Sequence, residues 1–83
     1  MTYVRKNSGV CSASTEVTLD DNNKIDSVKV VGGCNGNLKG VSALLEGMDA
    51  NEAIRRLEGL RCGNKQSSCP DQIAQTLKEA LAQ

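Results

Sequence analysis

Four cysteines, Cys11, Cys34, Cys62 and Cys69, are the feature that most constrains how this chain folds. The chain has 83 residues with no Phe, no Trp and a single Tyr, so its core must be built from Val, Leu, Ile, Met and Ala. We expect one domain over residues 1–83. Domains of this size rarely gain more than about 3–5 kcal/mol from a hydrophobic core alone, and many add a covalent or metal cross-link. In this sequence the four thiols are the groups that supply one.

Charge and hydropathy exclude several classes of partner. Ten basic and ten acidic side chains cancel, and the single aromatic residue leaves almost nothing for bases to stack on, so nucleic-acid binding is disfavoured. Residues 1–10 lack the apolar run of a signal peptide, and no segment approaches the roughly 20 apolar residues that span a membrane. We therefore expect a cytoplasmic protein with no membrane partner. In that compartment, grouped cysteines bind metal more often than they form disulfides.

Alternating small and β-branched residues predict two strands, over residues 9–19 and 25–33. Asp and Asn residues at 20–23 mark a turn between them, so the two strands form an antiparallel hairpin. Residues 2–5 also suit extended backbone and allow a short third strand.

The register of this hairpin follows from its hydrophobic pattern. A four-residue loop pairs Asp20 with Ile25, and the same register then gives the pairs Val17–Val28, Thr15–Val30 and Ala13–Gly32. Directly paired residues share a sheet face, so the apolar residues of both strands meet on one face. Continued outward, the register places Cys11 opposite Cys34, although the cysteines were not used to derive it.

Two helices are predicted directly after the hairpin. Apolar residues at helical spacing mark the first, from Leu38 to Met48, and Gly47 is placed to end it in a left-handed conformation. The second begins with a capping box, in which Asp49 is the N-cap and Glu52 reaches back to it.

A third helix completes the predicted fold. Gly59 stops the second helix, and a polar loop leads to Ser68, which caps the third helix, with Pro70 in its first turn. Apolar residues at helical spacing continue to Leu81. The fold class is therefore α+β, an antiparallel hairpin followed by three helices in the order ββααα.

The four cysteines are predicted to meet in one site. Cys62 and Cys69 bracket the loop before the third helix, and the helix N-terminus favours the thiolate form of Cys69. If this helix packs on the sheet, its start brings two sulfurs to Cys11 and Cys34, and four thiolates around zinc form a closed structural site. No Cys-x-x-Cys pair is present, so the prediction depends on geometry rather than spacing. Two disulfides, Cys11–Cys34 and Cys62–Cys69, or four unlinked thiols are the alternatives, and iron–sulfur ligation suits the same four residues.

A glycine-rich segment, residues 32–40, runs from the second strand into the first helix. Backbone N–H groups at Gly33, Gly36 and Asn37 could bind an anion there, such as a nucleotide phosphate. The segment matches neither a Walker A sequence nor a dinucleotide fingerprint. On the alternative interpretation, the glycines let the chain turn tightly around Cys34 and Asn37 caps the helix. The sequence contains no histidine and no visible nucleophile–base pair, so no catalytic residue is assigned.

Three segments together resemble a known family. Residues 34–40, 59–63 and 67–72, the last reading Ser-Ser-Cys-Pro-Asp-Gln, are similar to the TSCPD domain family, and most of all to its small stand-alone members with four cysteines. The resemblance covers nearly the whole chain. Ser67 stands where the motif that names the family has threonine, a change that keeps the hydroxyl group.

The resemblance implies a link to ribonucleotide reductase. Related domains lie near the C-terminus of the large chain of the coenzyme-B12-dependent enzymes, and an 83-residue chain lacks their catalytic barrel. It therefore implies an accessory or homologous domain, with ribonucleotide reductase or a nucleotide as partner, rather than an enzyme that reduces nucleotides alone. Two other functions fit the residues: a thiol redox protein that uses Cys62 and Cys69, and a structural module that forms a homodimer.

Overall fold

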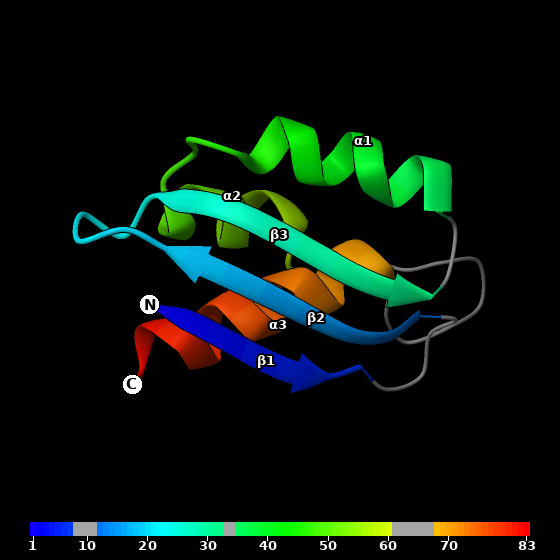
Figure 1. The fold of residues 1–83 in the computed structure, drawn as a ribbon, viewed down its shortest axis with the longest axis horizontal. Helices are drawn as coiled ribbons and strands as arrows, with labels where there is room; N and C mark the ends of the chain where they lie inside the picture. The colour runs from blue at the N-terminus through cyan, green and yellow to red at the C-terminus, as the bar shows by residue number, and fades with distance from the viewer. Residues whose placement is uncertain (8–11, 33–34, 61–67) are drawn as a thin grey trace.

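The computed structural model describes residues 1–7, 12–32, 35–60 and 68–83, and for residues 12 and 35–37 it describes the backbone alone. A three-stranded antiparallel sheet is followed by three helices (Figure 1). The strands are β1 (Thr2–Lys6), β2 (Ser12–Leu19) and β3 (Ile25–Gly32), and the helices are α1 (Asn35–Leu45), α2 (Ala50–Leu57) and α3 (Cys69–Leu81). The predicted α+β fold is confirmed, and the residues predicted to allow a third strand form β1.

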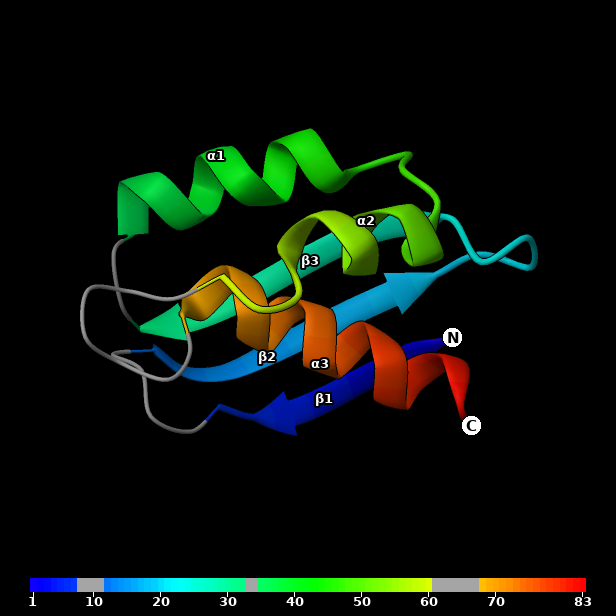
Figure 2. The same ribbon diagram turned by 180° about the vertical axis from the view of Figure 1, so that it is seen from behind.

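The described helices cover one face of the sheet, and no described helix covers the other, which is called the bare face. Figure 1 looks onto the bare face, and Figure 2, from behind, shows α2 and α3 in front of the strands. Helix α3 packs against β1 and β2, α1 packs against β3, and α2 packs against α3. None of the described helices combines the length and the apolar character needed to cross a membrane.

The core lies between the sheet and the helices and is aliphatic, as the composition requires. Its most deeply buried apolar side chains are those of Val17, Ile25, Ile73 and Leu77, together with small alanines on α2 and α3. Strand alternation turns these strand residues toward the helices and leaves Val31, on the other face, 60% exposed. The alternation of apolar and polar residues in β2 and β3 therefore correctly predicts which face of the sheet is buried.

The predicted hairpin register is correct in the middle and wrong at the turn. Val17 pairs with Val28, as predicted, but Ile25 pairs with Leu19 rather than Asp20. The ladder shifts at Asp26, which is the extra residue of a β-bulge. The one-residue shift leaves Asp20 in the turn instead of the ladder.

Asp20 organises that turn. Its carboxylate accepts hydrogen bonds from the backbone N–H groups of Asn22 and Lys24, both at 2.9 Å. Asn23 takes a left-handed conformation with φ 61°, which asparagine tolerates better than most residues. These local bonds compete with the regular ladder and explain why the pairing shifts by one residue.

The predicted register is also wrong at the other end of the hairpin. Gly32 pairs with Ser12 rather than Ala13, because the ladder shifts again between Ser12 and Ser14. The pairing of Cys11 with Cys34 was an extension of the regular register past this point. Both cysteines lie outside the described residues, so their pairing stays a prediction that the regular register no longer supports.

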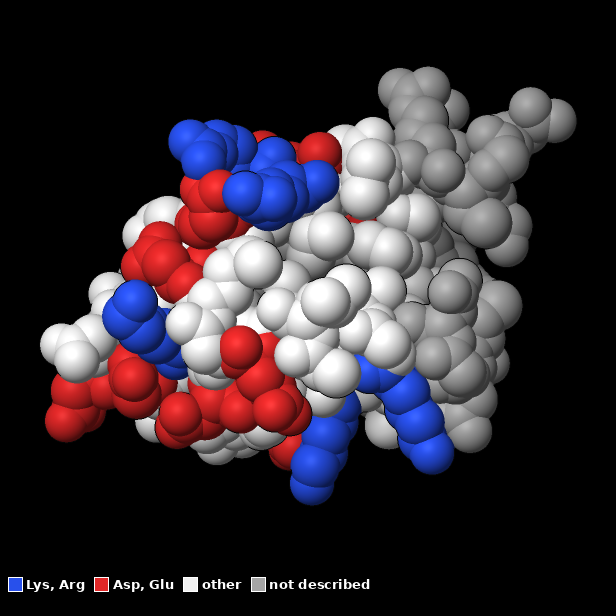
Figure 3. Space-filling view, turned by 90° about the horizontal axis from the view of Figure 1, so that it is seen from above, with Lys and Arg blue, Asp and Glu red and all other residues white. Residues whose placement is uncertain are grey.

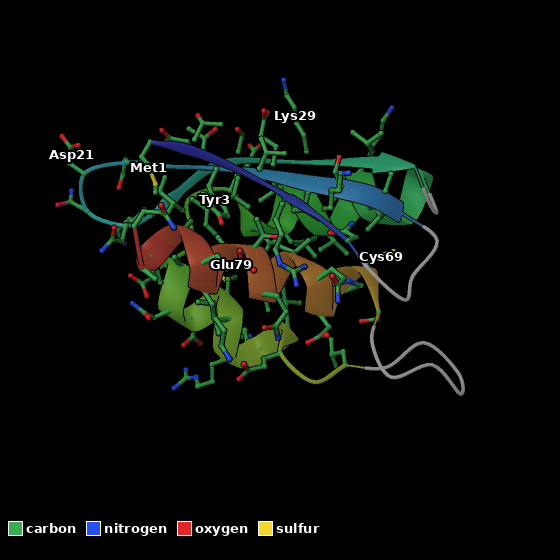
Figure 4. The ribbon with its side chains drawn as sticks, turned by 90° about the horizontal axis from the view of Figure 1, so that it is seen from below. Met1, Tyr3, Asp21, Lys29, Cys69 and Glu79 are labelled. Carbon is green, nitrogen blue, oxygen red and sulfur yellow. The ribbon has the colours of Figure 1, made fainter. Side chains whose placement is uncertain are left out.

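Strand β1 is attached to α3 by side chains far apart in the sequence. The Tyr3 hydroxyl donates to the Glu79 carboxylate at 2.8 Å, and Arg5 pairs with the same carboxylate and donates to Gln72 Oε1 at 2.6 Å. Tyr3 and Glu79 face each other between strand and helix (Figure 4). The hydrogen bond from Tyr3, followed by that from Arg5, lowers the pKa of Glu79.

The helix ends confirm most of the predicted signals. Asp49 caps α2 by accepting from the Glu52 N–H at 3.2 Å, and Gly47 and Gly59 have φ of 83° and 85°. The predicted return contact of Glu52 is wrong, because its carboxylate pairs with Arg55 and Arg56 instead. These pairs lie on an exposed helix face, and the hydrogen bond from Arg56 is the main cause of a lowered Glu52 pKa.

Candidate functional site: the cysteine end of the sandwich

The described residues that neighbour the cysteines in sequence lie at one end of the molecule. Strand β2 begins one residue after Cys11, α1 begins one residue after Cys34, and α3 begins at Cys69. The pairing of Ser12 with Gly32 holds the start of β2 beside the end of β3. Figures 1 and 2 both show these element ends at the same end of the molecule, opposite the hairpin turn.

The chain after α2 returns to the same end. Gly59, three residues before Cys62, donates its backbone N–H to Asp71 Oδ1 at 2.8 Å. Asp71 lies in the first turn of α3, so this bond holds Gly59 beside the start of that helix. The described flanks of all four cysteines therefore approach one another.

Cys69 is the cysteine that the structure describes. Its side chain is half-buried, and it is the first residue of α3, directly after the N-cap Ser68. The Ser68 hydroxyl accepts from the Asp71 N–H at 3.1 Å, and Pro70 occupies the first turn as predicted. Backbone N–H groups and the helix dipole at this position stabilise a sulfur anion, the form that binds metal.

The chain also matches the model of a known family. The model of the TSCPD domain matches residues 1–81 of the chain. The chain belongs to the TSCPD domain family. No curated protein and no solved structure matches it at a significant level.

The described part of the motif that names the TSCPD family, residues 68–71, is the start of α3, and a hydrogen bond joins it to Gly59. Ser68 is the N-cap, Cys69 and Pro70 are the first helical residues, and Asp71 is 7% exposed. Sequence analysis locates this helix start from Ser68 and Pro70. It misses the bond from Gly59, because nothing in the spacing shows that the end of α2 reaches the start of α3.

The remaining predicted site residues are placed less fully. Cys11, Cys34, Cys62 and Gly33 lie outside the described residues. Gly36 and Asn37 lie in the first turn of α1, at the cysteine end of this TSCPD domain. The prediction that Asn37 caps α1 is wrong, because the helix already begins two residues earlier, at Asn35.

Acidic and thiol groups elsewhere do not form a second metal site in the described part of the chain. Across residues 1–7, 12–32, 35–60 and 68–83, no three Cys, Asp or Glu side chains lie close enough to hold a metal ion. Three of the four cysteines lie outside those ranges, so the four-cysteine site stays a prediction.

A groove that sequence analysis does not predict lies between β3 and α1. Its volume is about 430 Å³, and its lining includes the apolar residues Val28, Val30 and Leu38 and the charged residues Lys29, Lys39 and Glu46. The available signal was the helical spacing of Lys39 and Glu46, which are two turns apart. That spacing alone does not distinguish a groove wall from an exposed helix face.

Proposed function

We propose that this TSCPD domain is a zinc-stabilised accessory domain, related to ribonucleotide reductase, that binds a nucleotide or a protein partner. Zinc would be held by Cys11, Cys34, Cys62 and Cys69. The observation that carries the proposal is that the described flanks of these residues lie together at one end of the sandwich.

The residues suit zinc by their chemistry. Four thiolates are a common ligand set of closed structural zinc sites, and Cys69 at a helix N-terminus is favoured as a thiolate. A closed site leaves no open coordination position for a substrate. The ion would therefore cross-link the hairpin to the helices and supply stability that an aliphatic core of this size lacks.

Metal analysis of the protein purified under reducing conditions tests the proposal. We expect one zinc ion per chain, and loss of zinc when any of the four cysteines is replaced by serine. Leu44→Ser is the matched control, because Leu44 is 78% exposed and its side chain has no group that could bind zinc. A metal-free chain with four titratable thiols would contradict the proposal. An absorption band of an iron–sulfur cluster in the visible range would show that the four cysteines bind a cluster instead of zinc.

Nucleotide binding is proposed at the start of α1. Gly36 and Asn37 are in the first helical turn, where backbone N–H groups are unpaired within the helix, and Gly33 precedes it in sequence. Titration with ADP, followed by amide chemical shifts, should move these residues first. Shifts confined to other regions would remove them from the proposal.

Thiol redox chemistry is the second candidate function. The Gly59–Asp71 bond holds Gly59, three positions before Cys62 in the sequence, beside the first turn of α3, which begins at Cys69. Two thiols would lose two protons and two electrons to a disulfide oxidant and form one intramolecular disulfide. A mass lower by two hydrogen atoms after mild oxidation, reversed by dithiothreitol and absent in Cys69→Ser, would favour this function over zinc.

A further inference from the structure

Strand β3 presents an open edge over most of its length. It is the last strand of the sheet, and among the described strands it pairs with β2 alone. At its start the outer side is occupied, because the Ile25 N–H donates to the Met48 carbonyl at 2.9 Å and the Ile25 carbonyl accepts from the Gly47 N–H at 2.7 Å. Over residues 27–32, no backbone bond joins the outer side of β3 to any described residue. An edge strand of this kind offers a row of N–H and C=O groups to another strand.

Helix α1 converts this edge into one wall of a groove. The helix runs beside β3 in the opposite direction (Figure 1). The groove of about 430 Å³ between them lies within the range of about 300–1,000 Å³ typical of binding pockets. Its apolar residues include Val28 and Leu38, each 6% exposed. An extended chain could place alternate side chains against them while its backbone pairs with β3.

The charged residues that line the groove differ in sign along its length. Lys39, in the first half of α1, and Lys29 both line it, and neither forms an ion pair with another described residue. Lys29 projects from the bare face of the sheet (Figure 4). Glu46 lines the groove just past the end of α1. Seen from above, basic and acidic side chains form separate small groups rather than one field of a single sign (Figure 3).

We propose that an extended segment of a partner protein binds this groove by adding a fourth strand to the edge of β3. An acidic side chain of the segment lies near Lys29 and Lys39, whose positive charges form no ion pair with a described residue and complement it. Main-chain bonds to β3 give the affinity, and the apolar residues of the groove select alternate side chains. This inference rests on the proposed binding role but does not depend on zinc.

A second copy of the chain fits this edge poorly. Its own β3 would carry its own α1 along the same edge, so pairing β3 with β3 would bring two helices into one space. Pairing β3 with the β1 edge of another copy joins two different surfaces, and such contacts give open chains of molecules unless they close into a ring. The groove therefore suits a single strand from a different protein.

Peptide selection tests the inference without a known partner. Random nine-residue peptides displayed on phage are selected against the full chain as purified, and bound peptides are mapped by amide chemical shifts. We expect the shifts to concentrate on residues 27–32 and 38–46, and the selected peptides to share an acidic residue. The double variant Lys29→Glu/Lys39→Glu should weaken binding about tenfold. Lys6→Glu, on the opposite edge strand β1, should leave the affinity unchanged.

Backbone methylation separates strand addition from other kinds of binding. Each peptide amide nitrogen is methylated in turn, and we expect strong weakening at every second position, because only alternate N–H groups of an added strand face β3. Equal effects at all positions, shifts elsewhere on the molecule, or failure to select any peptide would overturn the inference. If inorganic phosphate reproduces the chemical shift changes at both lysines, the groove binds an anion and not a peptide strand, which would also overturn the inference. A dimer that dissociates on dilution and is lost in the double variant would replace it with a second copy.

Zinc content, measured on the same preparation, keeps the two proposals apart. Peptide binding by metal-free protein would support the groove and contradict zinc. Zinc-loaded protein that binds no peptide would contradict the groove alone.

Discussion

The two ends of the domain, one at the β2–β3 turn and one at the start of α3, are held together in different ways. At the hairpin-turn end, marked by Asp21 in Figure 4, backbone groups of separate segments bond one another. Examples are Ile25 to Met48 at 2.9 Å and Ala50 to Asn23 at 2.9 Å. At the cysteine end, Ser12 and Gly32 pair through the backbone of the sheet, but the described bonds that join the start of α3, at Cys69, to other elements depend on side chains.

The side chains at the cysteine end each join segments distant in sequence. Asp71 accepts from Gly59, and Arg5 donates to Gln72. A backbone network needs no particular side chain, whereas single side-chain bonds fail with one substitution. This difference explains why the proposed cross-link by cysteines would be useful at one end of the fold and not at the other.

Loss of one cysteine should have the largest effect. Cys34→Ser removes a proposed zinc ligand, and we expect the whole domain to lose its cooperative thermal transition, because metal binding can supply much of the folding free energy of small domains. A strong chelator should have the same effect on the unmodified protein. A melting curve unchanged by both treatments would show that the cysteine end is stable without metal.

Asp71→Ala should have the next largest effect. It removes the acceptor of the Gly59 N–H from a buried position, so we expect the free energy of unfolding to fall by about 1–3 kcal/mol in urea denaturation. Asp26→Ala, at an exposed position of β3, is the matched control and should change it by less than about 0.5 kcal/mol. Equal effects of the two changes would remove Asp71 from the account of the cysteine end.

Asp49→Ala should have a smaller effect at the turn end. It removes the N-cap of α2, which is worth about 1 kcal/mol, but leaves the backbone network around Ile25 intact. Asn51→Ala, exposed on the same helix, serves as the control in the same urea experiment. A loss larger than that of Asp71→Ala would reverse the proposed ranking of the two ends.

The smallest effect should be a dependence of stability on pH that comes from Glu79, where α3 contacts β1. Hydrogen bonds from Tyr3 and Arg5 lower the pKa of Glu79 below its ordinary 4.5, so the carboxylate contributes stability above that pH. This contribution should fade as the pH falls below about 4.5, toward the lowered pKa.

Thermal melts between pH 3 and 7 check the expectation for Glu79, and the range brackets the ordinary value of 4.5. Glu79→Gln should flatten the part of the pH dependence that Glu79 causes, and Tyr3→Phe should reduce it. Glu46→Gln, at an exposed groove position, should keep the full dependence. A Glu79→Gln protein with the original pH profile would contradict the assignment.

Local signals made the helices predictable from the sequence. Asp49 and Ser68 each accept from the N–H three positions further on, and Gly47 takes a left-handed φ of 83° just after α1, so these roles follow from spacing alone. The return contact of Glu52 failed because two arginines further along the same helix compete for its carboxylate. Even a local signal is therefore uncertain where several partners lie within reach.

Long-range features were not predictable from these patterns. The bulges at Ala13 and Asp26 insert one residue each without changing the hydrophobic alternation that set the register. Arg5 and Glu79 are 74 residues apart, and no pattern links them. The groove beside β3 depends on where α1 packs. The cysteine grouping was predicted by extending a register that shifts, so it needs a direct measurement.

Zinc K-edge X-ray absorption of the reduced protein tests the central claim most directly, since it reports the atoms bound to the ion. We predict one zinc per chain with four sulfur ligands at about 2.3 Å, and a change in ligation or loss of the ion in Cys69→Ser. Protein that contains no metal, with its cysteines present as four thiols or two disulfides, would contradict the account of this end of the fold.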